Sequence, residues 1–230
     1  MKNLVIYYPS YEKGGATKIL INLINHFLKK NIRIFLVINE FDLKHKNLEI
    51  VKIGNKYKIF KLRFFSSLIG FFKLIKLISN LDRNETKILS MQSNFFSTIA
   101  SYLFRFKIIV RVSEDPCGAT KFADEFILSY IVLFSKLITY NIATFVIVNA
   151  EKSFNCVKKL VLNKNKVKIL YNPSLKKINK FKVRKKNRYF LTVGRLCKQK
   201  NQKLIIEAFA EFYKDHKKYK LIICGDGPDK

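Results

Sequence analysis

Acidic residues, glycine, proline and cysteine are all scarce in this chain of 230 residues, and tryptophan is absent. With eight Gly and four Pro, the chain is neither collagen-like nor a low-complexity repeat. Only 16 Asp and Glu accompany 45 Lys and Arg, which gives a formal net charge of +29. Hydrophobic residues still make up 49% of the chain, and this share excludes a disordered polymer. The length allows one large domain or two small ones.

Four cysteines are present, Cys117, Cys156, Cys197 and Cys224, and they form no C-x-x-C pair. This spacing argues against a disulfide scaffold or a zinc ribbon. Reduced, mostly buried thiols in a cytosolic protein are the expected state. The three histidines form no H-E-x-x-H motif, so the sequence predicts no metal site.

Two apolar segments raise the question of membrane insertion or export. The run at residues 4–8 is too short for the apolar region of a signal peptide and predicts a first strand. Residues 126–150 are long enough to span a bilayer. However, Asn141 interrupts them, and residues 144–148 are β-branched and typical of a strand. We therefore favour a buried helix followed by a buried strand over a membrane span.

Short apolar runs alternate with segments of helical periodicity along most of the chain. The expected strands are residues 4–8, 33–38, 48–53, 87–91, 107–112, 144–149, 167–171, 189–193 and 221–224. The expected helices lie around residues 20–28, 61–79, 95–104, 122–140, 151–162 and 204–212. This alternation predicts an α/β fold with a parallel, doubly wound sheet.

The sequence also divides the chain into parts. Residues 1–175 form the expected N-terminal Rossmann-like domain. Residues 176–188 are rich in Lys and Arg, hold no acidic residue, and are interpreted as a basic linker. Residues 189–230 carry only a β-α-β unit, which cannot bury a normal domain core. We therefore expect them to be the truncated start of a second Rossmann-like domain.

Three loops at predicted strand ends carry candidate binding residues, because ligands of open α/β sheets bind there. Gly14 and Gly15 precede the first helix, where small residues and the helix dipole favour an anion; a plain turn is the alternative. Residues 111–116 place a cation and two carboxylates after a strand, or form an ordinary polar loop. Arg195 and Lys200 can converge on one phosphate group, or belong to a solvated basic loop.

The C-terminal motifs resemble the signature of glycosyltransferase family 4, the retaining, nucleotide-sugar-dependent enzymes of the GT-B fold. They are VGRL at residues 193–196, KNQ at 200–202, EAF at 207–209 and GDGP at 225–228. The N-terminal half is similar to the family as well. Its matching segments are residues 14–16, 111–116, 146–151 and 169–173. The resemblance covers nearly the whole chain in order.

This resemblance implies two facing Rossmann-like domains, with the acceptor on the first and the nucleotide sugar on the second. Arg195 and Lys200 would bind the donor diphosphate and stabilise the departing nucleotide, so neither a metal nor a cofactor is expected. Gly14 and Gly15 would approach the donor phosphate or the acceptor.

Two further roles follow from the resemblance at the loop after residue 112. Arg111 and Ser113 would contact the acceptor or the sugar, and Glu114 would act on the sugar or an acceptor hydroxyl as the candidate catalytic residue. The expected reaction transfers a sugar from a nucleotide sugar, with a UDP-sugar as the expected donor, to a growing cell-surface glycan or a lipid-linked oligosaccharide, with retention. In the family, two glutamates lie later in the second domain, at positions that would come after Lys230. The chain is therefore expected to be a truncated and inactive fragment.

The basic residues leave other partners open. Phe65, Leu68, Ile69, Phe72 and Ile75 share one stripe of the helix at residues 61–79, interspersed with lysines. This helix either faces the core or lies on anionic lipid, which would make the protein cytoplasmic and peripheral at the inner membrane face. A basic nucleic-acid-binding module is the rival class, but no nucleic acid is expected, since no such motif is present. A non-catalytic subunit that needs a partner is a third reading.

Overall fold

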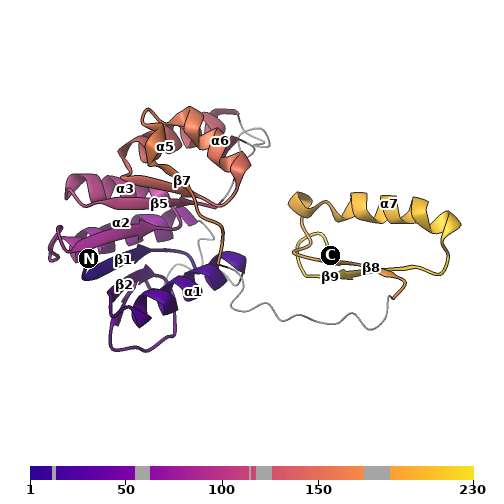
Figure 1. Cartoon of the computed structure of the whole chain (residues 1–230), viewed down its shortest axis with the longest axis horizontal. Coiled ribbons are helices and arrows are strands. Elements are labelled where there is room, and N and C mark those ends of the chain that lie inside the picture. The colour runs from indigo at the N-terminus through magenta and orange to yellow at the C-terminus, as the bar shows by residue number, and fades with distance from the viewer. Residues whose placement is uncertain (12–13, 55–62, 114, 118–125, 174–186) are drawn as a thin grey trace. The chain divides into compact units, whose positions relative to one another are not determined.

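The computed structural model describes residues 1–11, 14–54, 63–113, 115–117, 126–173 and 187–230. The chain forms two compact units, Met1–Lys176 and Lys177–Lys230, which are considered separately (Figure 1). Residues 174–186, which include most of the predicted linker, lie outside the described residues.

Unit 1 is a seven-stranded parallel sheet with helices between its strands. Its strands are β1 (Asn3–Tyr7), β2 (Arg33–Ile38), β3 (Leu48–Lys52), β4 (Thr86–Ser90), β5 (Ile108–Val112), β6 (Phe145–Val148) and β7 (Val167–Ile169). Its helices are α1 (Gly15–Lys29), α2 (Arg63–Ile78), α3 (Asn94–Leu103), α5 (Phe126–Ile142) and α6 (Glu151–Leu160). The strand order is β3-β2-β1-β4-β5-β6-β7, the doubly wound arrangement that the alternating sequence predicts.

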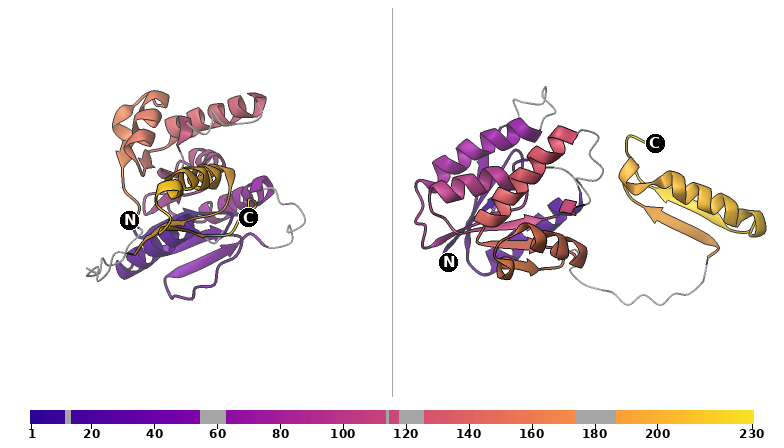
Figure 2. Two further views of the ribbon diagram at one scale, coloured as in Figure 1. Left: turned by 90° about the vertical axis from the view of Figure 1, so that its right-hand side faces the viewer. Right: turned by 90° about the horizontal axis from the view of Figure 1, so that it is seen from above.

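The central strands are apolar on both faces because helices cover both. Along β1, Val5 and Tyr7 belong to one buried cluster, while Leu4 and Ile6 belong to another. The first cluster includes side chains of α2, α3 and α5, and the second those of α1. Seen from above, α2, α3 and α5 lie beside one another (Figure 2). This two-sided burial explains why no strict polar alternation marks these strands.

The stripe of helix α2 that faces the core differs from the stripe that its hydrophobic pattern predicts. Its buried positions are Ser67, Gly70, Leu74 and Ile78, whereas Phe65 and Phe72 are exposed. The small Ser67 and Gly70 let the helix approach the Tyr7 ring, whose hydroxyl donates to the Ser67 carbonyl oxygen at 2.7 Å. Among the described residues, no helix is long and apolar enough to cross a membrane.

Two cysteines contradict the expectation of reduced thiols. Cys117, in the segment after β5, forms a disulfide with Cys156 of α6, at a sequence separation of 39 and a Cα–Cα distance of 6.1 Å. Cys197 and Cys224 are free, and Cys224 is exposed instead of buried. Spacing rules detect cysteines that are close in sequence, whereas this pair is brought together only in the fold, where α6 packs beside β6 and β7.

Unit 2 pairs β8 (Tyr189–Val193) in parallel with β9 (Lys220–Cys224), connected by α7 (Gln202–Asp215). The α7 face of the sheet is held by aromatic contacts: the ring of Phe190 lies 6.0 Å from Phe209 and 5.2 Å from Phe212. The opposite face exposes Tyr189, Leu191 and Ile222 in this unit. The predicted β-α-β unit is thus formed, with little buried core of its own.

We predict that Leu74→Ala lowers the free energy of unfolding by about 2–5 kcal/mol, because Leu74 is fully buried and its truncation leaves a cavity. Phe72→Ala, on the same helix and 61% exposed, should change it by less than about 0.5 kcal/mol. Urea denaturation followed by circular dichroism measures both. Equal losses for the two variants would contradict this orientation of α2.

Candidate functional site

The strand order of unit 1 reverses between β1 and β4, the place where open α/β sheets bind ligands. The loops that leave these strands are joined by a hydrogen bond from the Ser10 backbone N–H to Gln92 Oε1 at 2.9 Å. The next backbone N–H, that of Tyr11, donates to Asn39 Oδ1 at 2.7 Å, which ties in the end of β2. We call this edge of the sheet, with Ser10, Gly14, Gly15, Gln92, Asn94 and Arg111, the switch-point edge.

Two helices begin at the switch-point edge without a side-chain cap. Helix α1 follows Gly14, and α3 follows Ser93, and neither residue makes a capping hydrogen bond from its side chain. A Cβ added to Gly14 or Gly15 would meet no atom within 4 Å, so open space adjoins this backbone. Free N–H groups and the positive end of the helix dipole favour an anion at such a place.

Arg111 is the buried cation of this edge. It is 7% exposed, and its Nη1 and Nη2 donate to Ser113 Oγ at 2.7 Å and to Asn172 Oδ1 at 2.6 Å. Burial lowers the pKa of the guanidinium from its ordinary value, while Tyr8 acts in the opposite direction. An arginine nevertheless stays protonated at neutral pH. Its hydrogen-bond partners among the described residues are neutral, which leaves its charge available to an anionic or polyhydroxylated ligand.

A chain of buried and partly buried hydrogen bonds holds the backbone of Arg111. Asn94 Nδ2 donates to the Arg111 carbonyl oxygen at 3.2 Å, and Ser90 Oγ donates to Asn94 Oδ1 at 2.7 Å. Ser97 Oγ in turn donates to Ser90 Oγ at 2.6 Å. These contacts link the ends of β4 and β5 to α3, so the edge is rigid where the ligand would bind.

The structure describes four of the five residues that the sequence predicts for a site in unit 1. Gly14 and Gly15 lie exposed at the start of α1, and Arg111 contacts Ser113 at the end of β5, so all four are on one edge of the sheet. Glu114, the candidate catalytic residue, lies outside the described residues. Ser113 is exposed and holds the Arg111 side chain as a hydrogen-bond acceptor.

Sequence reasoning did not single out the amides of this edge. Gln92, Asn94 and Asn172 each follow a strand, and each contacts another loop or the Arg111 residue. A polar residue directly after a buried strand was the available signal. It is a weak one because most exposed loops also begin with such residues.

The basic loop of unit 2 has its shape fixed by backbone contacts. A Cβ on Gly225 would overlap the Gly194 carbonyl oxygen, and one on Gly227 would overlap that of Leu196. The Gly194 N–H donates to the Cys224 carbonyl oxygen and the Leu196 N–H to that of Asp226, both at 3.0 Å. The GDGP segment therefore supports the VGRL segment directly, which gives a physical reason for these two glycines.

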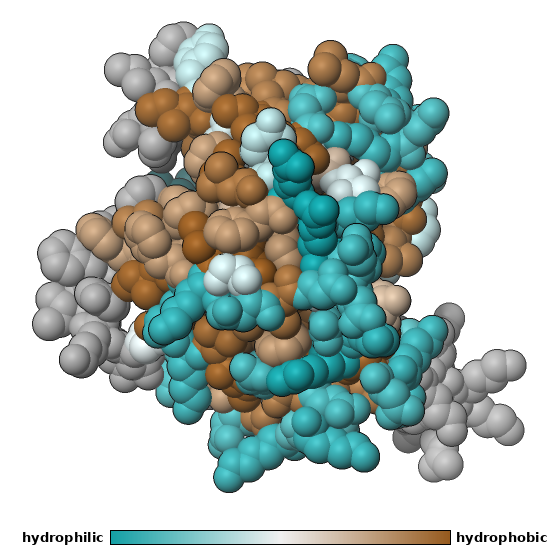
Figure 3. Space-filling model, turned by 90° about the vertical axis from the view of Figure 1, so that its left-hand side faces the viewer, coloured by the Kyte–Doolittle hydropathy of each residue, from teal (hydrophilic) through white to brown (hydrophobic). Residues whose placement is uncertain are grey.

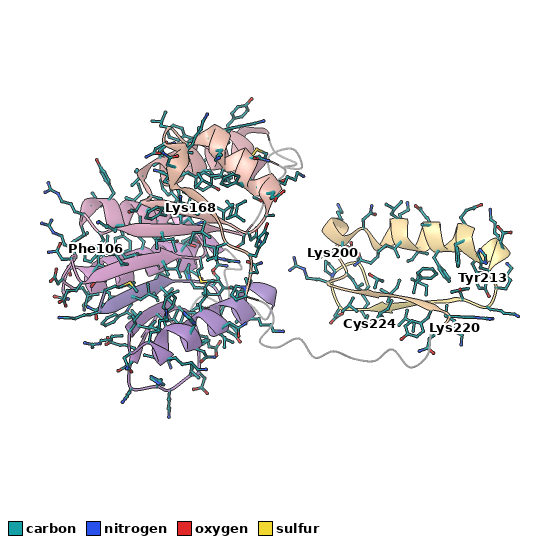
Figure 4. The ribbon with its side chains drawn as sticks, viewed as in Figure 1. Phe106, Lys168, Lys200, Tyr213, Lys220 and Cys224 are labelled. Carbon is teal, nitrogen blue, oxygen red and sulfur yellow. A yellow bond between two sulfur atoms is a disulfide. The ribbon has the colours of Figure 1, made fainter. Side chains whose placement is uncertain are left out.

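Arg195 and Lys200 are both exposed at the carboxyl end of β8. Lys200 belongs to the short 3-10 helix Lys198–Lys200, just before α7, and lies at the Cys224 end of the unit, far from Tyr213 and Lys220 (Figure 4). The Arg195 carbonyl oxygen accepts from Gln202 Nε2 at 2.9 Å, which joins the loop to the start of α7. Within unit 2, the two cations and a helix N-terminus thus share one end.

The C-terminal part of the chain is similar to one protein-family model. Residues 174–230 match the family model described as "Glycosyl transferases group 1". No curated protein matches the sequence significantly.

Solved structures share the fold at low sequence identity. Anabaena Alr3699/HepE in complex with UDP and glucose is similar with a TM-score of 0.66 and 15% identity over 99% of this chain and 61% of its own. The lipopolysaccharide outer core galactosyltransferase WaaB is similar with a TM-score of 0.61 and 18% identity over 100% of this chain and 62% of its own. UDP-GlcNAc 2-epimerase from Methanocaldococcus jannaschii is similar with a TM-score of 0.58 and 13% identity over 97% of this chain and 65% of its own.

These similarities confirm the predicted GT-B type α/β fold, which a galactosyltransferase and an epimerase share. The fold by itself therefore does not select a reaction.

The chain spans about three fifths of the length of the HepE and WaaB structures.

We predict that Asn172→Ala lowers the free energy of unfolding of unit 1 by about 1–3 kcal/mol, because it leaves a buried Arg111 N–H group without its acceptor. The control is Glu49→Ala, which removes an exposed ion pair with Arg33 and should cost less than about 1 kcal/mol. Chemical denaturation measures both. A smaller loss for Asn172→Ala than for the control would show that Arg111 does not depend on this contact.

Proposed function

We propose that the chain belongs to a retaining glycosyltransferase of family 4 that transfers a sugar from a nucleotide-sugar donor. The observation that carries this proposal is the basic loop of unit 2, which lies inside the segment that matches the glycosyltransferase model. Its two exposed cations, Arg195 and Lys200, lie beside the start of α7. This is the combination of charge and helix dipole that a diphosphate requires.

In the proposed reaction, the bond between the sugar and the diphosphate breaks and negative charge develops on the departing nucleotide. Arg195 supplies a planar guanidinium and Lys200 a compact ammonium, so the two stabilise that charge in the transition state. No metal is required for this role. The donor is proposed to be a UDP-sugar, in keeping with the UDP and UDP-glucose bound by the HepE structures.

Unit 1 would supply the acceptor side of the reaction. Arg111 and Ser113 would contact the acceptor or the transferred sugar, and Glu114 would act on an acceptor hydroxyl. Gly14 and Gly15 offer open backbone beside the start of α1, where a donor phosphate could approach. We further propose a cell-surface glycan or a lipid-linked oligosaccharide as acceptor.

We predict that Arg195→Ala and Lys200→Ala each weaken binding of UDP to this chain about tenfold or more, since a hydrogen bond to a charged group contributes roughly 1.5–3 kcal/mol. Lys198→Ala is the matched control, because it removes one exposed positive charge from the same short helix. Isothermal titration calorimetry with UDP and UDP-glucose measures the affinities. Equal weakening in all three variants would mean that net charge alone attracts the nucleotide.

The proposed lipid-linked acceptor fits the surface of unit 1. Exposed apolar side chains gather on the neighbouring helices α2, α3 and α5: Phe72, Tyr102, Leu103, Ile131 and Phe134, each 61–65% exposed. These three helices contain no Asp or Glu, and α2 adds the exposed Lys73 and Lys76.

Figure 3 shows apolar side chains gathered on one side of the molecule beside a hydrophilic band. Aromatic and basic side chains together favour binding to anionic lipid. We propose peripheral binding at the cytoplasmic membrane face.

We predict that the chain floats with liposomes containing anionic phospholipid and not with purely zwitterionic ones. Phe72→Ser combined with Phe134→Ser should reduce flotation several-fold, because each removes an exposed aromatic side chain from the lipid contact. A control variant, Leu162→Ser, removes an apolar residue that is 92% exposed outside these helices and should float as the wild type does. Flotation that does not depend on lipid charge would contradict the proposal.

A further inference from the structure

We propose that Asp115, Cys117 and Cys156 form a redox-gated binding site for a thiophilic divalent cation such as Zn²⁺. The three residues each offer one ligand atom, and these atoms all lie within 4.8 Å of one another. Two come from the segment after β5 and one from α6, so the site exists only in the folded unit.

The backbone geometry suits coordination by both thiolates. At a Zn–S distance of ~2.3 Å, two ligands of a tetrahedral ion lie ~3.8 Å apart. The Cα atoms of Cys117 and Cys156 are 6.1 Å apart. Opening the disulfide to that sulfur separation therefore needs side-chain rotation and little movement of the backbone. Cys156 is 6% exposed, which keeps one side of the site away from solvent.

Asp115 is oriented by contacts to both oxygens of its carboxylate. Its Oδ1 accepts from the Cys117 backbone N–H at 3.2 Å, and its Oδ2 lies 3.0 Å from Lys152 Nζ. A carboxylate has about four lone-pair sites, so an oxygen that makes such a contact can also bind a metal. Outer contacts of this kind commonly orient metal-binding carboxylates.

The charges of the site balance when a divalent cation is bound. Two thiolates and one carboxylate carry three negative charges, while the cation carries two positive charges and Lys152 one. The site with its metal is therefore neutral, whereas two neighbouring thiolates without metal would repel each other in a partly buried place. Water would complete the coordination sphere as the fourth ligand.

Reduction gates the site. A dithiol reductant transfers two electrons and two protons to the Cys117–Cys156 disulfide and is itself oxidised to a disulfide. The cation then displaces the two thiol protons as the Zn–S bonds form. In the oxidised protein both sulfur atoms are bonded to each other and neither is available as a thiolate ligand.

The site also controls a segment of the switch-point edge. Asp115 lies two residues beyond Ser113, the hydrogen-bond partner of Arg111. Either the disulfide or the cation connects this segment to α6. In the reduced, metal-free protein the Asp115–Lys152 ion pair still joins this segment to α6.

The test uses Co²⁺ as a spectroscopic probe for the reduced full chain, after the reductant has been removed. We expect one equivalent of Co²⁺ to produce a sulfur-to-metal charge-transfer band in the near ultraviolet, and Zn²⁺ to displace it. The oxidised protein should give no band. Cys117→Ser and Cys156→Ser should each abolish it, and Asp115→Asn should weaken Co²⁺ binding about tenfold or more.

The control is the double variant Cys197→Ser and Cys224→Ser, which removes the two free cysteines and should keep the band. If Cys156→Ser fails to fold, Cys117→Ser and Asp115→Asn decide the outcome. No band in the reduced wild type overturns the proposal, as does a band that disappears in the double control variant and persists in Cys117→Ser.

Discussion

The buried guanidinium of Arg111 is the contact on which the geometry of unit 1 depends at its carboxyl edge. A cation with 7% exposure must be hydrogen-bonded, and its donors reach Ser113 and Asn172. Through them it joins the end of β5 to the segment after β7. Asn94 holds its backbone from the other side. Segments that follow three strands are therefore joined at one desolvated charge.

Most of the fold could be predicted from the sequence, because its evidence is local. The runs at residues 33–38 and 189–193 coincide with β2 and β8, since each is a short apolar segment bounded by polar residues. Helix α6 begins at Glu151, where the expected helix begins. Parallel strands buried on both faces need nothing more specific than apolar β-formers, so pattern alone specified the doubly wound sheet.

The site and the covalent cross-link were harder to predict because they depend on contacts between distant segments. The pairing of Cys117 with Cys156 and the contact of Arg111 with Asn172 span 39 and 61 residues. No local pattern encodes which strand end meets which helix. Helix α2 shows the same limit: the stripe that periodicity selected includes the exposed Phe72, whereas Gly70 and Leu74 are the residues that face inward. Arg195 and Lys200 could be proposed from the sequence because their motif is compact.

In the basic loop, the glycines of the GDGP segment determine the backbone shape, whereas other residues supply the charge. Gly225 and Gly227 press against backbone atoms of Gly194 and Leu196, while the side chains of Arg195 and Lys200 extend into solvent. Evolution can thus exchange the chemical groups displayed there without rebuilding the scaffold that displays them. The same separation lets the charge of this loop be changed by substitution while its backbone shape is kept.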